Sequence, residues 1–180
     1  DILKRMLDYD FNDIKIVGND NGEPFSDNYF KNEWLFKVKN FKEVEIVSNM
    51  NMIDEDYITR LHDNFIEKNI PIGFLSSIVS TNKSTYEKIM VGGNFNKAIE
   101  NSLYLDSLGI LKTINYLITK DNLDEFCSCD IKEEFKKLGF HNCRLYVMED
   151  LTRKEKKLDI EKAYDAYICN NKGVSFTSLS

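Results

Sequence analysis

Two spacings of hydrophobic positions alternate along the chain. Short β-branched runs at 14–17 and 44–47 each stop at a polar stretch, which is typical of strands that end in loops. Between 54 and 69 the apolar residues recur every three to five positions instead, which is the spacing of one helix face. This pattern predicts a helix that Asp54 caps and that ends before Pro71. Its expected apolar face consists of Tyr57, Ile58, Leu61, Phe65 and Ile66.

The next apolar run, at 70–75, completes a strand, helix and strand within about thirty residues, the length of a βαβ unit. A connection of this kind joins parallel strands, because a hairpin cannot accommodate an intervening helix. We therefore expect 44–47 and 70–75 to run parallel in one sheet.

The second half of the chain predicts further elements of both kinds. Residues 95–119 show helical spacing, interrupted near Ser107 to Gly109, and are expected to form two short helices or one kinked helix. A helix over 131–138 and a strand over 144–148 follow. The last elements are a helix over 158–168 and an edge strand over 174–177.

These elements predict one α/β domain over residues 1–180. The expected core is a mainly parallel open sheet of four or five strands flanked by helices, in Rossmann-like or flavodoxin-like layering. The chain opens at Asp1 and not at a methionine, so we hold open that it is a domain of a larger polypeptide.

Charge and composition exclude two classes of partner. Lys and Arg number 24 against 30 Asp and Glu, a net charge of -6, whereas phosphate binding needs a basic surface. No nucleic-acid partner is therefore expected. No apolar run approaches the roughly 18 residues that span a bilayer, so no membrane span is expected either. Four cysteines in 180 residues favour a reducing, cytoplasmic location over a disulfide scaffold.

Polar residues leave several predicted strands at their carboxyl ends, where parallel sheets collect ligands. Such residues are also common as turn formers and helix caps, which is the simpler explanation for them. If they form a polar pocket for a small ligand, the lining residues are Asn19, Asp20, Ser48, Asn49, Ser76 and Ser77.

Sharper motifs for cofactors and metals do not match. The loop from Gly18 to Pro24 lacks the phosphate-binding and dinucleotide-binding glycine patterns, and Asp20 and Glu23 are more simply explained by a turn than by a metal site. Cys127, Cys129, His141 and Cys143 are the soft metal ligands that lie near one another in the sequence, but one residue separates each pair, unlike zinc sites. We expect no metal, no cofactor and free thiols.

Cys129 has one further possibility. It precedes the predicted helix over 131–138, and the positive end of a helix dipole lowers the pKa of a thiol. A nucleophilic cysteine would also need His62 or His141 beside it, and neither is an evident partner.

Two functional hypotheses follow. The first is a noncatalytic binding or protein-interaction module, a domain or subunit of a larger assembly with a protein partner. An aromatic group would be its contact surface if it is not packed against the sheet: Phe25, Tyr29, Phe30, Trp34 and Phe36. The alternative is an enzyme or small-ligand binder whose site lies at the strand ends. The sequence contains no recognisable set of catalytic residues that would identify a reaction.

Overall fold

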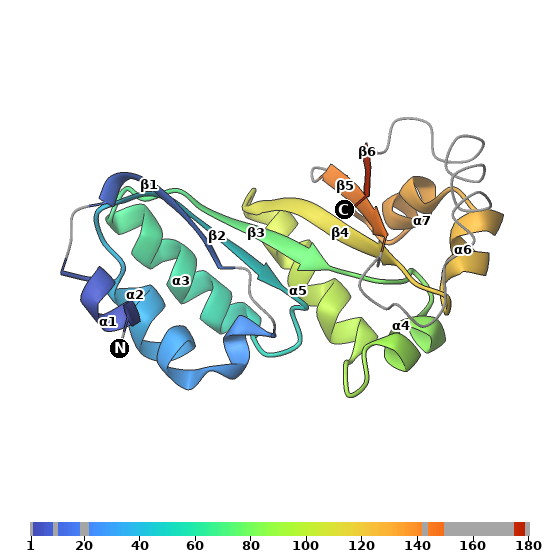
Figure 1. Ribbon diagram of the computed structural model, residues 1–180, viewed down its shortest axis with the longest axis horizontal. Coiled ribbons are helices and arrows are strands. Elements are labelled where there is room, and N and C mark those ends of the chain that lie inside the picture. The colour runs from blue at the N-terminus through green and yellow to red at the C-terminus, as the bar shows by residue number, and fades with distance from the viewer. Residues whose placement is uncertain (1, 9–10, 19–21, 142–143, 150–174, 179–180) are drawn as a thin grey trace.

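The computed structural model describes residues 2–8, 11–18, 22–141, 144–149 and 175–178. Six parallel strands in this part form one sheet, and their order in the sheet is their order in the chain (Figure 1). The strands are β1 (Phe11–Gly18), β2 (Phe41–Ser48), β3 (Ile72–Ser77), β4 (Leu111–Ile118), β5 (Arg144–Glu149) and β6 (Ser175–Ser178). An α/β fold built on an open parallel sheet is thereby confirmed.

One helix precedes β1, and the other helical elements lie between strands. They are α1 (Ile2–Met6), η1 (Pro24–Ser26), η2 (Phe30–Trp34), α2 (Leu35–Lys37), α3 (Glu55–Glu67), α4 (Lys83–Ile89), α5 (Phe95–Ser107), α6 (Leu123–Ser128) and α7 (Ile131–Lys137). Short polar side chains start four of them by accepting backbone N–H bonds: Asp54, Asn82, Asn94 and Asp130. None of the described helices is long and apolar enough to cross a membrane.

The strands expected at 14–17, 44–47, 70–75 and 144–148 all belong to the sheet, and β6 confirms the edge strand expected at 174–177. The helix expected over 158–168 lies outside the described residues.

The helical prediction for residues 95–119 is correct only as far as Ser107, where α5 ends. Gly109 then adopts a φ of 72°, and the chain continues as strand β4. The apolar spacing of three between Leu111 and Ile114 resembles a helix because the pairing of β3 with β4 shifts register beside Lys112. Beyond that irregularity Ile114, Tyr116 and Ile118 alternate as a strand requires.

The helices of the described residues lie on one face of the sheet, which differs from the expected Rossmann-like or flavodoxin-like layering. Those folds cover both faces because their strand order reverses at one point, whereas this order never reverses. The buried side chains of the strands, such as Ile46, Phe74 and Ile114, face the helices. Lys15 and Glu43 are register partners on the other face, which we call the open face. The strands and helices are connected in the same order as in a (β/α) barrel, but the sheet is open.

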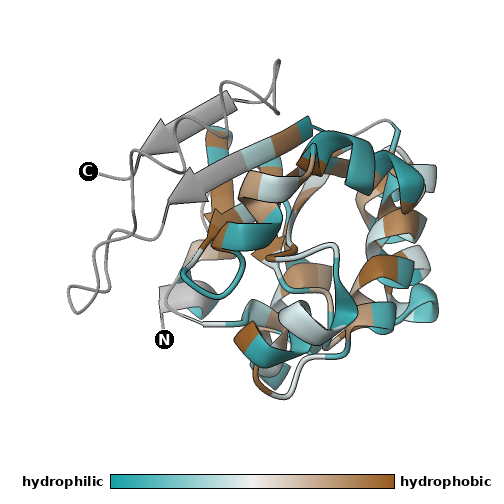
Figure 2. Ribbon diagram, turned by 90° about the vertical axis from the view of Figure 1, so that its right-hand side faces the viewer, coloured by the Kyte–Doolittle hydropathy of each residue, from teal (hydrophilic) through white to brown (hydrophobic). Residues whose placement is uncertain are grey.

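The core fills the space between the sheet and the helices, and Figure 2 shows apolar residues gathered there. The predicted face of α3 is buried at four of its five positions, whereas Ile66 is 61% exposed. The aromatic residues at 25–36 also pack inward. Phe25 and Trp34 are fully buried, and the Phe25 ring lies 6.3 Å from that of Phe74. They contribute to the core more than to an exposed patch.

Candidate ligand site at the strand ends

A cavity of about 290 Å³ lies at the carboxyl ends of β2 and β3. Its lining comes from the segment after β1, the ends of β2 and β3, and the residue that follows α4: Gly22, Glu23, Val47, Ser48, Asn49, Ser77 and Met90. The carboxyl ends of parallel strands meet at one edge of a sheet, so segments far apart in sequence converge here.

Glu23 is the charged residue of this cavity and is held in place from three sides. Its Oε1 accepts a 2.8 Å hydrogen bond from the Ser48 hydroxyl and a 3.2 Å bond from the Phe25 amide. Its Oε2 accepts a 2.8 Å bond from the Asn49 amide. Glu23 also caps η1, and Pro24 at the next position is preorganised for a helical start. The carboxylate therefore fastens η1 to the end of β2 in a fixed orientation.

Asn51 ties the same loop to the helices on its far side. Its side-chain amide donates to the Tyr86 hydroxyl at 2.9 Å, and its Oδ1 accepts the Asn94 backbone amide at 2.6 Å. Burial raises the pKa of Tyr86, the Asn51 hydrogen bond lowers it, and the neighbouring Glu23 carboxylate adds to the rise. The Tyr86 hydroxyl thus stays neutral and rigidly placed.

Two further side chains fasten the strand-end loops. The buried Asn101 amide donates to the carbonyl oxygens of Met50 at 2.7 Å and Ile53 at 2.8 Å. Glu125 accepts the backbone amide of Thr81 at 2.8 Å. Because these loops are held by buried or charge-assisted bonds, the rim of the cavity is preorganised.

The structure brings together three of the predicted site residues. Ser48, Asn49 and Ser77 line the cavity. Ser76 is not with them: it is fully buried on the helix side, 2.7 Å from the Ser102 hydroxyl of α5. Consecutive strand residues point to opposite faces, and this alternation separates Ser76 from Ser77. Asn19 and Asp20 lie outside the described residues.

Sequence reasoning missed Glu23 as a lining residue because its loop was explained as a turn. A proline at the first helical position is a helix-start signal, and Pro24 could therefore have indicated that Glu23 caps a short helix. Met90 lies 42 positions from Ser48, and no local pattern connects the two residues.

A second hollow, of about 600 Å³, lies where α3, α4 and α5 begin. Charges of both signs line it together with asparagines: Asp54, Glu55, Asp56, Lys83, Asn94, Asn96, Lys97, Glu100 and Asn101. The side chains of Asp54 and Asn94 are already engaged as helix caps. This hollow has no lining residue in common with the smaller cavity.

The two cysteines that the structure describes, Cys127 and Cys129, are not arranged as a reactive site. Cys129 is a free thiol, and it donates to the Glu125 carbonyl at 3.1 Å. Burial and nearby carboxylates, Glu125 foremost, raise the pKa of Cys129 to about 11, which disfavours the alternative of a thiol activated by a helix dipole. Cys143 lies outside the described residues, and no metal-binding group of three or more His, Cys, Asp or Glu residues occurs within them.

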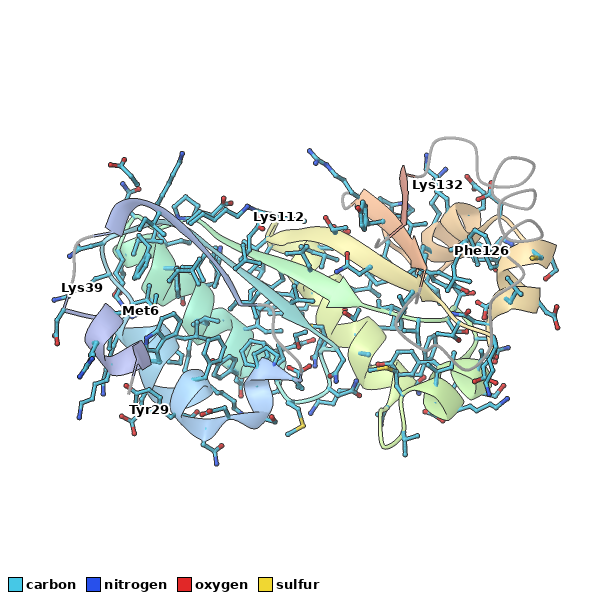
Figure 3. The ribbon with its side chains drawn as sticks, in the orientation of Figure 1. Met6, Tyr29, Lys39, Lys112, Phe126 and Lys132 are labelled. Atoms are coloured by element: carbon cyan, nitrogen blue, oxygen red, sulfur yellow. The ribbon has the colours of Figure 1, made fainter. Side chains whose placement is uncertain are left out.

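The open face carries a charge cluster of Lys15, Glu43, Glu45 and Lys112. The Lys15 ammonium lies 2.7 Å from Glu45 and 3.3 Å from Glu43, and the Lys112 ammonium lies 2.9 Å from Glu45 and also contacts Glu43. Lys112 belongs to β4 and the glutamates to β2, so its side chain crosses β3 at Gly73. Figure 3 shows Lys112 on the side of the sheet away from α3 and α5.

No protein-family model matches the chain, and no curated protein matches it. The site therefore has to be interpreted from its own geometry.

Proposed function

We propose that the protein binds a small polar ligand in the cavity at the carboxyl ends of β2 and β3. The observation that carries this proposal is the convergence of Glu23, Asn49 and Ser77 on one cavity of about 290 Å³. Open parallel sheets bind ligands at the carboxyl ends of their strands, and (β/α) barrels with the same connectivity do so as well.

The chemistry of the lining supports a polar ligand of modest size. Small-molecule sites measure roughly 300 to 1,000 Å³, so this cavity lies at the lower limit. The Ser77 hydroxyl and the Asn49 side-chain nitrogen make no hydrogen bond within the described residues, and each is free to contact a ligand. Val47 and Met90 add apolar walls. Such a mixture fixes the orientation of a ligand through a few polar groups.

A second candidate function is a protein-interaction module in a larger assembly. All-parallel sheets normally have both faces covered, whereas the helices within the described residues cover only one. Val17 is 50% exposed beside the charge cluster of the open face. A protein partner that covered this face would bury such side chains, as the interaction hypothesis requires.

A fragment screen by two-dimensional NMR tests the first candidate. The screen uses a library of neutral, anionic and cationic polar fragments with the full chain. We expect the fragments that bind to shift the amide signals of Ser48, Asn49 and Ser77 together. Ser77→Leu should abolish these shifts because it fills the cavity.

Thr113→Leu is the matched control, since Thr113 is also a half-buried strand residue on the open face. It should leave fragment binding unchanged. If no fragment shifts the three signals, or if the shifts survive Ser77→Leu, the ligand site is wrong. Fragments that shift Val17 and its neighbours on the open face instead would favour the interaction module.

A further inference from the structure

The charge cluster of the open face lies where it can control the curvature of the sheet. Helices pack about 8 to 10 Å apart, whereas neighbouring strands are about 4.8 Å apart. A sheet with all its helices on one face must therefore curl with the helices outside, so the open face is the concave one. Side chains that meet across a concave face hold its two ends together.

The cluster spans the first four strands of this arc. Lys15 stands on β1, Glu43 and Glu45 stand on β2, and Lys112 reaches them from β4 over Gly73. The two glutamates accept from both sides and lie deeper than the lysines: side-chain exposure is 14% for Glu45 but 37% for Lys112. The contacts therefore oppose any flattening that moves β4 away from β2.

The strand-end cavity is built on the same strands. One wall is Glu23, which follows β1 and is bonded to Ser48 at the end of β2. A second wall is Met90, which follows β3 and α4. A change in curvature between β1 and β4 therefore changes the separation of these two walls.

We infer that the charge cluster is an electrostatic clamp that keeps the arc tight and the helix-side walls of the strand-end cavity apart, and that ionic strength regulates it. A regulatory effect on ligand binding rests on the proposed ligand site, whereas the clamp itself is a property of the sheet. The lysines are more than a third exposed, so salt screens their attraction to the glutamates. Salt should therefore flatten the sheet and narrow the cavity.

Pulsed electron paramagnetic resonance can measure this width in the full chain. Spin labels on ketone-bearing amino acids at positions 28 and 91 leave the native cysteines untouched. Asn28 and Val91 are exposed, and they follow the Glu23 wall and the Met90 wall respectively. We expect a shorter and broader distance distribution when salt rises from about 0.01 M to about 1 M, which shortens the Debye length from about 30 Å to about 3 Å.

Lys112→Met should reproduce the high-salt distribution at low salt and remove the response to salt. Lys137→Met is the control, because Lys137 pairs with Glu134 within α7 and joins no strands. It should behave like the parent protein. A distribution that ignores both salt and Lys112→Met would overturn the clamp, as would an equal salt response with and without Lys112. These readouts need no ligand, so a failed fragment screen would leave them interpretable.

Discussion

The side chain of Lys112 lies directly on Gly73, and no other residue type leaves room for it there. A Cβ atom at position 73 would lie 2.3 Å from Lys112 Cε and 2.6 Å from Cδ. The missing side chain on β3 is what lets a lysine on β4 reach the glutamates on β2. This relationship can be measured as an energetic coupling.

We predict that Gly73→Ala and Lys112→Ala are coupled by about 0.5 to 1 kcal/mol in a double-mutant cycle. With Lys112 present, the new methyl group displaces the lysine and weakens its ion pairs. Without Lys112, the alanine should stabilise the strand because it reduces the entropy of the unfolded chain. Urea unfolding at low salt measures the cycle. Repeating it at high salt should shrink the coupling, and additive effects at low salt would contradict the prediction.

The second prediction concerns how substitutions on α3 change the free energy of unfolding. Leu61→Ala and Phe65→Ala should each lower the free energy of unfolding by about 2 to 5 kcal/mol, because both side chains are 1% exposed and truncation leaves a cavity. His62→Ala and Ile66→Ala lie on the same helix outside the core and should cost at most about 1 kcal/mol. The midpoints of denaturant unfolding, compared where the slope m is unchanged, measure the loss of stability in all four variants. Equal losses would show that the buried face of α3 has been assigned wrongly.

Two buried tyrosines should respond oppositely to loss of the hydroxyl group. The Tyr116 hydroxyl is buried without a hydrogen-bond partner in the described part of the chain, so Tyr116→Phe should be neutral or stabilising by up to about 1 kcal/mol. Tyr86→Phe removes the acceptor for the Asn51 amide and should cost about 1 kcal/mol. Thermal unfolding of the two variants gives the comparison. A large loss for Tyr116→Phe would reveal a hydrogen-bond partner for that hydroxyl.

The Cys129 thiol should be slow to alkylate at neutral and mildly alkaline pH. Its pKa is raised from the usual 9.0 to about 11, so the thiolate fraction is small. Mass spectrometry of iodoacetamide labelling at pH 8 should find Cys129 on the order of tenfold slower in the folded protein than in urea. A folded-state rate equal to that in urea would contradict the raised pKa.

The same shift makes stability depend on pH in a defined direction. The folded state holds the Cys129 proton more tightly than the unfolded state, so the contribution of Cys129 is complete below pH 9. It is lost as pH rises from 9 through about 11. Cys129→Ser should flatten that part of the pH profile, while Ser128→Ala, an exposed neighbour, should leave it unchanged.

The sequence was sufficient where a single local rule decides the structure. The β-branched runs at 14–17 and 44–47 are strands because they alternate between two faces, and Asp54 starts α3 because its carboxylate accepts the Tyr57 amide. Strand β4 could not be recognised in this way, since the register irregularity beside Lys112 interrupts its alternation and leaves a helix-like spacing.

The candidate site was predictable only in part for a related reason. Chain position alone placed Ser48, Asn49 and Ser77 at strand ends, and all three line the cavity. The face to which each residue points depends on the exact register, so Ser76 could not be separated from its neighbour. The one-sided helix layer follows from strand order, which no local pattern encodes.

The sequential strand order also affects how the chain can fold and change over evolution. Each strand pairs only with those before and after it in the chain, so every ladder joins segments separated by a single crossover. Such a sheet can grow by adding one unit at a time, as a growing chain leaves the ribosome, without waiting for a distant segment. For the same reason, duplication or deletion of a whole strand and helix at either edge would preserve every remaining pairing, which makes this architecture tolerant of changes in length.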